Sequence, residues 1–154
     1  MARTGKVPAK RAAGRRSPGT GFEQMTVKDI VNRRAKPARV DMKGDKVAAL
    51  LVKEGCAVPV VDKARRLVGI VSEHDLLSAL DAGRAWKAQQ ADELMSANPY
   101  SVRTETTLPT LVHVLTESDL LSAPVVNEAN RFLGVVTRRD VLRAALRPAV
   151  KRRR

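Results

Sequence analysis

An internal repeat at an offset of 65 residues is the feature that most constrains how this chain of 154 residues folds. The matched segments are residues 57–62 (AVPVVD) with 122–127 (SAPVVN), and residues 67–72 (LVGIVS) with 132–137 (FLGVVT). The match continues from Asp75 and Leu77 to Asp140 and Leu142. Two copies in one register predict two similar units of about 60 residues each, packed on each other.

Each copy has the same predicted order of secondary structure. A helix is expected over about residues 45–54, because Val47, Leu50 and Leu51 share one face and Gly55 suits a C-cap. The corresponding apolar positions in the second copy are Leu108, Leu111, Val112 and Leu115. Two β-branched runs follow as buried strands, and a last helix begins at Ser72 or Thr137. The predicted fold class is therefore α+β, with two tandem β-α-β-β-α units.

The net charge of +13 resembles that of a nucleic-acid-binding protein until it is divided along the chain. Residues 1–20 hold six basic and no acidic side chains, and residues 143–154 hold six more basic ones. This leaves 17 basic against 16 acidic residues between positions 21 and 142. We expect disordered basic tails that either improve solubility or bind nucleic acid or an acidic partner weakly, since no aromatic residue is interleaved with the charges.

These patterns give the expected domain limits. They are a tail over 1–21, a first unit over 22–83, a connector over 84–90, a second unit over 91–147 and a tail over 148–154. No apolar run approaches the ~20 residues needed to cross a bilayer, and no secretory signal is visible, so a cytoplasmic protein is expected. The single cysteine, Cys56, and the two distant histidines predict neither a metal site nor a disulfide.

Two duplicated motifs connect the chain with a known family. Pro-Val-Val occurs at 59–61 and 124–126, and Gly-hydrophobic-x-Ser/Thr-x-x-Asp occurs at 69–75 and 134–140. Together they resemble the cystathionine β-synthase (CBS) domain, which typically occurs as tandem pairs. The resemblance covers about residues 25–146 and implies one pseudo-two-fold module with two clefts for AMP, ATP, S-adenosylmethionine or related adenosyl compounds. It also implies a homodimer, a regulatory function without catalysis, and no obligatory cofactor.

The resemblance assigns roles to residues of both copies. The aspartates Asp75 and Asp140 are expected to bind the ribose, and the helix starts at Ser72 and Thr137 to favour phosphate. The positions expected to approach the adenine are Val27, Val58, Ala91 and Ala123. Arg138 and Arg139 follow Thr137, whereas Glu73 and His74 follow Ser72, so the second cleft is expected to prefer a phosphorylated ligand.

Simpler interpretations stay open for the same residues. Ser-x-x-Asp and Thr-x-x-Asp are also helix-capping boxes, and the two arginines are equally consistent with a solvated helix face. Ser72, His74 and Asp75 cannot converge as a catalytic triad from one helical turn. Packing is the expected role of Cys56 and of Trp86. An alternative function for the whole chain is a structural dimerisation adaptor whose clefts are vestigial.

Overall fold

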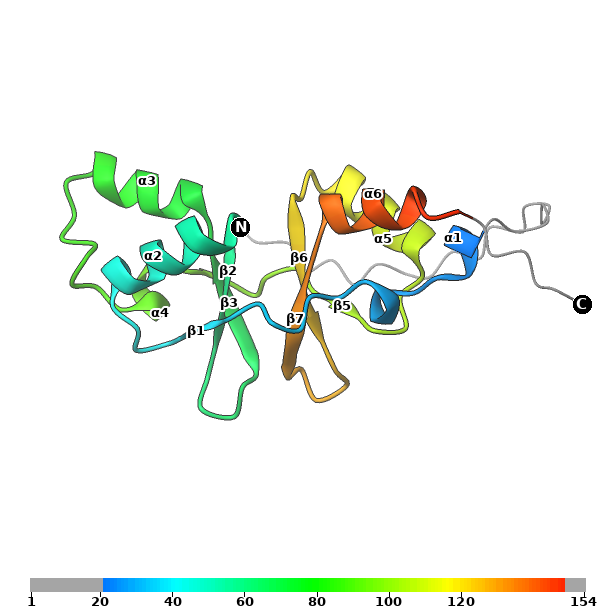
Figure 1. Ribbon diagram of the computed structural model, residues 1–154. Coiled ribbons are helices and arrows are strands. Elements are labelled where there is room, and N and C mark those ends of the chain that lie inside the picture. Colours follow the sequence, from blue (N-terminus) through cyan, green and yellow to red (C-terminus); the bar gives the residue numbers. More distant parts are fainter. Residues whose placement is uncertain (1–20, 149–154) are drawn as a thin grey trace, which may run out of the picture.

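The computed structural model describes residues 21–148, which form two similar lobes side by side (Figure 1). The tails expected to be disordered lie outside these residues, except for Gly21 and Pro148. Each lobe contains one copy of the repeat, with its helices on one side and its long β-hairpin extending away from them (Figure 1). The arrangement confirms the predicted α+β class and the pair of units.

Both units have the order β-α-β-β-α. The first comprises β1 (Ala38–Arg39), α2 (Gly44–Glu54), β2 (Val58–Val61), β3 (Leu67–Val71) and α3 (Glu73–Asp81). The second comprises β5 (Val102–Arg103), α5 (Leu108–Glu117), β6 (Ser122–Val126), β7 (Phe132–Thr137) and α6 (Arg138–Ala145). Short leading elements precede them, namely α1 (Gly21–Gln24) and a 3-10 turn, η1 (Val27–Asp29), before the first unit, and α4 (Ala91–Leu94) and β4 (Ser96–Ala97) before the second.

The sheets explain why the apolar runs are continuous. In each unit the first strand pairs in parallel with the second, and the second pairs antiparallel with the third. Every residue of β2 and β6 is buried, because these strands are central and covered on both faces. β4 adds a fourth strand, antiparallel to β3.

The helices begin and end where local chemistry indicates. Ser72 and Thr137 are the N-caps of α3 and α6, and in each case the aspartate three residues later completes a capping box. Gly55 ends α2 in the left-handed conformation at φ 69°, as expected for a C-cap glycine. No helix within residues 21–148 is long and apolar enough to cross a membrane.

The units exchange their leading turns, which the sequence did not indicate. Val27 is fully buried in the core of the second unit, and its N–H donates to the Thr106 carbonyl at 2.8 Å. Ala91 is fully buried in the core of the first unit, and its N–H donates to the Met42 carbonyl at 2.8 Å. Each core is therefore completed by a segment that precedes the other unit.

Gly134, the glycine of the Gly-hydrophobic-x-Ser/Thr-x-x-Asp motif in the second unit, allows the segment that leads into the first unit to approach the second sheet. Asn32 and Val135 of β7 exchange two backbone hydrogen bonds, of 2.9 and 3.2 Å. A Cβ atom on the neighbouring Gly134 would clash with the Asn32 carbonyl oxygen. Only glycine therefore permits this close crossing, which brings Asn32 and Ala35 to the wall of the candidate site.

Candidate functional site

A cleft of about 510 Å³ lies between the two units, at the start of α6. The first unit and its leading segment contribute Asn32, Ala35, Glu54, Gly55 and Cys56. The second unit contributes Leu121, Val135, Thr137, Arg138, Arg139, Asp140 and Arg143. The structure thus brings four of the predicted site residues together, namely Thr137, Arg138, Arg139 and Asp140.

Asp140 uses its two carboxylate oxygens for different partners. Oδ2 accepts hydrogen bonds from the Thr137 backbone N–H at 2.9 Å and from the Thr137 hydroxyl at 3.0 Å. Oδ1 accepts one from the Arg143 guanidinium at 3.2 Å. The side chain of Asp140 is 17% exposed, whereas that of Arg143 is 71% exposed. The helix cap therefore uses Oδ2, the inner oxygen. The outer oxygen, Oδ1, is bonded to the long, exposed side chain of Arg143, which a ligand can displace.

The three arginines of the cleft differ in how far they are already engaged. Arg138 donates to the carbonyls of Leu120 at 2.6 Å and Leu115 at 3.3 Å, and to the Asp119 carboxylate at 3.1 Å. These bonds of its guanidinium therefore hold the loop that follows α5 in place. Arg139 is exposed and has no ion pair within residues 21–148. Arg139 and Arg143 are the cations most available to an anion in this cleft.

Cys56 lines the opposite wall of the cleft, half-buried. Burial raises the pKa of its thiol above the ordinary value, and the nearby Glu54 carboxylate adds to the rise. The thiol is therefore protonated at neutral pH. Its packing against the cluster of Ala35, Val61, Phe132 and Val135 agrees with the expected structural role.

The corresponding motif in the first unit has a different environment. Asp75 Oδ2 accepts from the Ser72 N–H at 2.7 Å and from its hydroxyl at 2.9 Å, as in the second unit. Its other oxygen, Oδ1, accepts from the Ser96 hydroxyl at 3.2 Å. His74 Nε2 lies 3.4 Å from the Ser78 hydroxyl, further along the same helix. No group of three or more His, Cys, Asp or Glu side chains in the described part of the chain is placed to hold a metal ion.

The structure places the four residues expected near the adenine in the cores. Val27, Val58, Ala91 and Ala123 are at most 1% exposed, and none of them is on the wall of the cleft. The cleft residues that sequence reasoning missed come mainly from the leading segment and the end of α2. Arg143 could have been found, because it lies one helical turn after Asp140.

Comparison with known proteins decides the family. The CBS domain profile matches residues 27–82 and 91–147, which together are more than half of the chain. The chain belongs to the CBS domain family. Its relatives include the chloroplastic CBS domain-containing protein CBSX2 of Arabidopsis thaliana, 32% identical over 130 residues. That alignment covers 66% of this chain and 54% of CBSX2, so the chain spans about half the length of this relative.

Solved CBS pairs have the same architecture. The crystal structure of CBSX2 in complex with AMP superposes with a TM-score of 0.70 at 31% identity, covering 79% of this chain and 96% of that one. The CBS domain pair of protein MJ0100, in complex with 5′-methylthioadenosine and S-adenosyl-L-methionine, superposes with a TM-score of 0.68 at 25% identity. That superposition covers 77% of this chain and 94% of the MJ0100 pair.

Proposed function

We propose that this CBS pair is a regulatory module that binds an adenine nucleotide in the cleft at the start of α6. The observation that carries the proposal is that Asp140 lines the cleft and that, within residues 21–148, its second oxygen is bonded to the exposed Arg143 alone. One carboxylate oxygen can accept hydrogen bonds from vicinal ribose hydroxyls. The AMP and adenosyl ligands of the CBSX2 and MJ0100 structures support this ligand class.

Charge in the cleft favours a phosphorylated ligand over a nucleoside. The cleft contains three arginines against the carboxylates of Glu54 and Asp140. Phosphate near the N-terminus of α6 would gain from the positive end of the helix and from the guanidinium of Arg139. AMP and ATP therefore fit this cleft better than adenosine does.

The same reasoning makes the first unit the weaker candidate. Ser96 holds the outer oxygen of Asp75 from the paired strand β4, and the acidic Glu73 follows Ser72 at the helix start. A phosphate group near that helix start would be repelled by Glu73. We therefore propose one working nucleotide site per chain, at Asp140.

Calorimetric titration of AMP, ATP and S-adenosylmethionine into the wild type, Asp140→Asn and Asp75→Asn tests the proposal. Asparagine keeps the size of the side chain but has an NH2 donor in place of one carboxylate oxygen, either the outer oxygen or the oxygen that caps the helix. Loss of hydrogen bonds to a charged acceptor is expected to weaken AMP binding to Asp140→Asn roughly 10- to 150-fold. Asp75→Asn, the matched control, should bind AMP as the wild type does.

Thermal melting of both variants separates loss of ligand contact from loss of the helix cap, since both aspartates complete the same capping box. An equal loss of AMP affinity in the two variants would contradict the assignment to one cleft. A wild-type protein that binds none of the three ligands would overturn the proposed function and favour a structural adaptor.

We also propose that the module pairs with a second copy of itself. Leu77 of α3 and Leu142 of α6 occupy equivalent positions in the two units, and each is 62% exposed. Val52 of α2, Leu80 of α3 and Leu146, the C-cap of α6, add further exposed apolar side chains. The two helical layers lie on the same side of the molecule (Figure 1), so an isologous dimer could cover both at once.

A further inference from the structure

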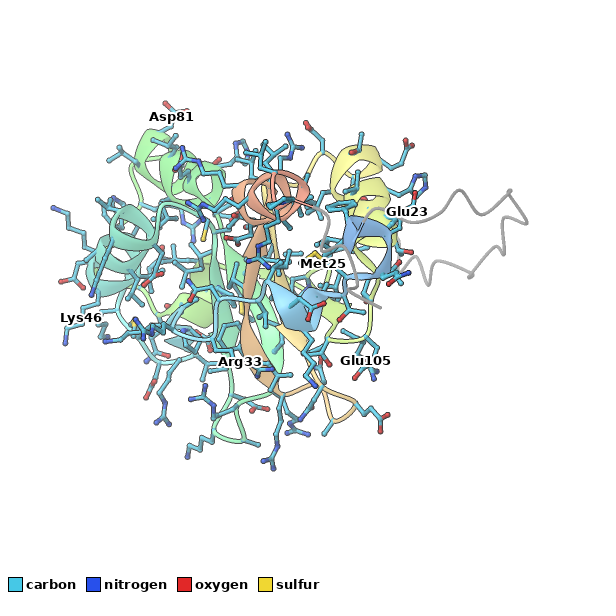
Figure 2. All side chains as sticks on the ribbon, turned by 45° about the vertical axis from the view of Figure 1, so that its right-hand side comes forward. Glu23, Met25, Arg33, Lys46, Asp81 and Glu105 are labelled. Atoms are coloured by element: carbon cyan, nitrogen blue, oxygen red, sulfur yellow. The ribbon has the colours of Figure 1, made fainter. Side chains whose placement is uncertain are left out.

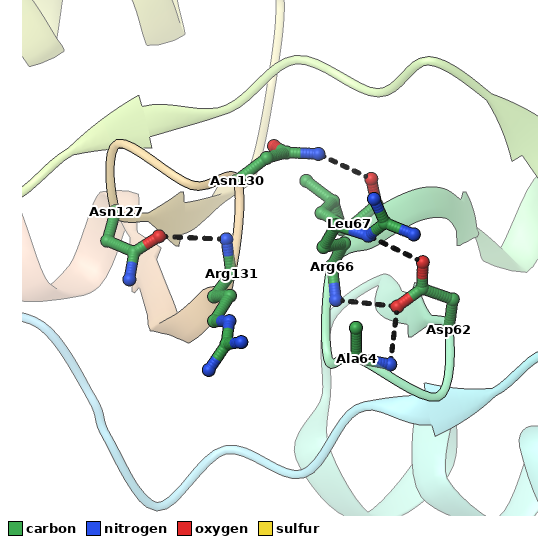
Figure 3. A network of polar contacts seen from close by, with 7 residues as sticks. All are labelled: Asp62, Ala64, Arg66, Leu67, Asn127, Asn130 and Arg131. Carbon is green, nitrogen blue, oxygen red and sulfur yellow. Dashed lines mark hydrogen bonds and ion pairs between the residues drawn. The ribbon is translucent and has the colours of Figure 1, made fainter.

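The two β-hairpin turns form the end of the molecule opposite the helices (Figure 1). They are residues 62–66 between β2 and β3, and residues 127–131 between β6 and β7. The turns are bonded to each other, because the Leu67 N–H donates to the Asn130 carbonyl and the Phe132 N–H to the Arg65 carbonyl, both at 2.9 Å. The Asn130 side chain also donates to the Leu67 carbonyl, at 2.9 Å (Figure 3). The two turns therefore form one hydrogen-bonded platform.

Each turn is held from within by an equivalent side chain. Asp62 accepts from the backbone N–H groups of Ala64 and Arg66, each at 2.9 Å. Asn127 accepts in the same way from Ala129 and Arg131, each at 3.0 Å. Figure 3 shows the bond from Arg131. Asp62 also pairs with the Arg66 guanidinium at 2.9 Å, so the acidic group of the first turn is engaged in holding that turn.

A third segment brings two more arginines to this end of the molecule. Asn32 bonds to Val135 of β7, and Ala35 packs against Val61 and Phe132 at the ends of the hairpin strands. Arg33 and Arg34 lie between these two anchors and are exposed. Figure 2 shows Arg33 in the lower part of the molecule, where the hairpins extend downward.

Positive charge is concentrated on these three segments. The hairpin patch consists of Arg33, Arg34, Lys63, Arg65, Arg66 and Arg131. These are six of the 19 basic residues between positions 21 and 148, but the same segments hold only Asp62 and Glu128 of the 16 acidic ones. The rest of residues 21–148 has 13 basic and 14 acidic residues. The three segments of the patch therefore account for all of the net positive charge of residues 21–148.

The charges of the patch are available to a partner. All six side chains are exposed, and Arg66 is the one member that has an ion pair within residues 21–148. Clustered like charges, five of the six without an ion pair in the described part of the chain, raise the local potential and attract an anion.

We propose that the hairpin patch binds the sugar–phosphate backbone of nucleic acid, irrespective of base sequence. Five of its six members are arginines, whose planar guanidinium groups bind phosphate oxygens in pairs. A duplex presents about one phosphate charge per 1.7 Å of its axis, which suits several exposed arginines on two adjacent turns and a crossing segment. Contacts to phosphate position a protein on a duplex without reading its sequence, and the patch contains no aromatic residue that could stack on unpaired bases.

The composition of the patch favours nucleic acid over an acidic protein. Stable protein interfaces centre on buried apolar or aromatic anchors. None of the large exposed apolar side chains of the described chain lies in residues 33–34, 62–66 or 127–131. Alanines, Ala64 and Ala129, are the apolar residues that these turns expose.

Fluorescence anisotropy with a labelled 20-base-pair DNA duplex and the full-length protein tests the proposal at several salt concentrations. The patch variant carries Lys63→Glu, Arg65→Glu and Arg131→Glu. The matched control carries Lys46→Glu, Arg84→Glu and Lys87→Glu, which make the same change in net charge at exposed positions of the first unit and of the connector that follows it. Figure 2 shows Lys46 on a side of the molecule away from the hairpin turns.

The patch variant should lose about tenfold or more in affinity at 50 mM salt, and its log–log salt slope should fall by about three. The control should stay within about threefold of the wild type. Equal losses in the two variants would assign binding to overall charge and overturn the proposal, as would a wild type that does not bind the duplex. Polyglutamate that competes as well as unlabelled duplex would favour an acidic protein instead. A variant with glutamine at the three patch positions repeats the test if the glutamates prevent folding.

Discussion

Asp140 shows how one side chain can hold the fold and still be available to a ligand. The capping box needs a single carboxylate oxygen, and Oδ2 supplies it through the two hydrogen bonds from Thr137. Oδ1 is left for the cleft, where Arg143 occupies it. The capping and ligand-binding interpretations of the motif therefore describe two oxygens of the same group and do not exclude each other.

Replacing Arg143 should change the affinities for nucleoside and nucleotide in opposite directions. Arg143→Ala frees Oδ1 of Asp140, so adenosine binding should improve by a few fold, in line with the small free energy of an exposed ion pair. AMP binding should weaken, because the cleft loses a cation that can reach the phosphate. Calorimetry with both ligands measures the difference, and Arg147→Ala, at an exposed arginine just beyond the end of α6, is the control. A change of the same sign for both ligands would contradict this role.

The reaction rate of the single cysteine, Cys56, is a measure of access to the same cleft. Because burial and Glu54 raise the pKa of the Cys56 thiol, less of it is thiolate at pH 8 than in an unperturbed cysteine. Its reaction with Ellman's reagent at pH 8 should therefore be slower than that of free cysteine, and should accelerate as the pH rises toward the raised pKa. Saturating AMP should slow the reaction further, since Cys56 lines the cleft. A rate that AMP does not alter would place the nucleotide elsewhere.

At the scale of the elements, the capping box of α6 predicts how substitutions at Thr137 change the free energy of unfolding. Thr137→Ala removes the hydroxyl that accepts from the Asp140 N–H at 3.2 Å and should lower the free energy of unfolding by about 1 kcal/mol. Thr137→Ser keeps the hydroxyl and should lose much less. Urea denaturation followed by circular dichroism measures both, and equal losses would show that the methyl group, not the cap, stabilises this helix end.

Elements that depend on local chemistry could be predicted from the sequence. Gly55 ends α2, and Ser72 and Thr137 begin α3 and α6, because caps are set by residues within one turn. β4 and the crossing at Asn32 were missed, since two- and one-residue pairings have no periodicity to recognise. The same limit applies to the cleft. A local sequence motif predicts Thr137 and Asp140 as cleft residues, but Asn32 and Ala35 reach the cleft through tertiary contacts that the sequence pattern does not show.

At the scale of the whole molecule, the exchanged turns join the two units into one folding unit. Val27 completes the second core and Ala91 the first, so neither copy of the repeat encloses its own core. The connection also fixes both helical layers on one side and both hairpins on the other (Figure 1). The proposed dimer surface and the hairpin patch therefore face in different directions, and a dimer through the helices leaves both patches free.

The apolar helical side makes a direct prediction about oligomeric state. Leu77→Asp together with Leu142→Asp places two charges at equivalent positions of the proposed interface, where each would be desolvated in a dimer. The double variant should be monomeric by light scattering at concentrations where the wild type is dimeric. Ala64→Asp with Ala129→Asp adds the same charge at the hairpin turns and should leave the dimer intact. A wild type that is monomeric, or a hairpin variant that dissociates as readily as the helical one, would contradict pairing through the helices and leave Leu77 and Leu142 free for a different partner.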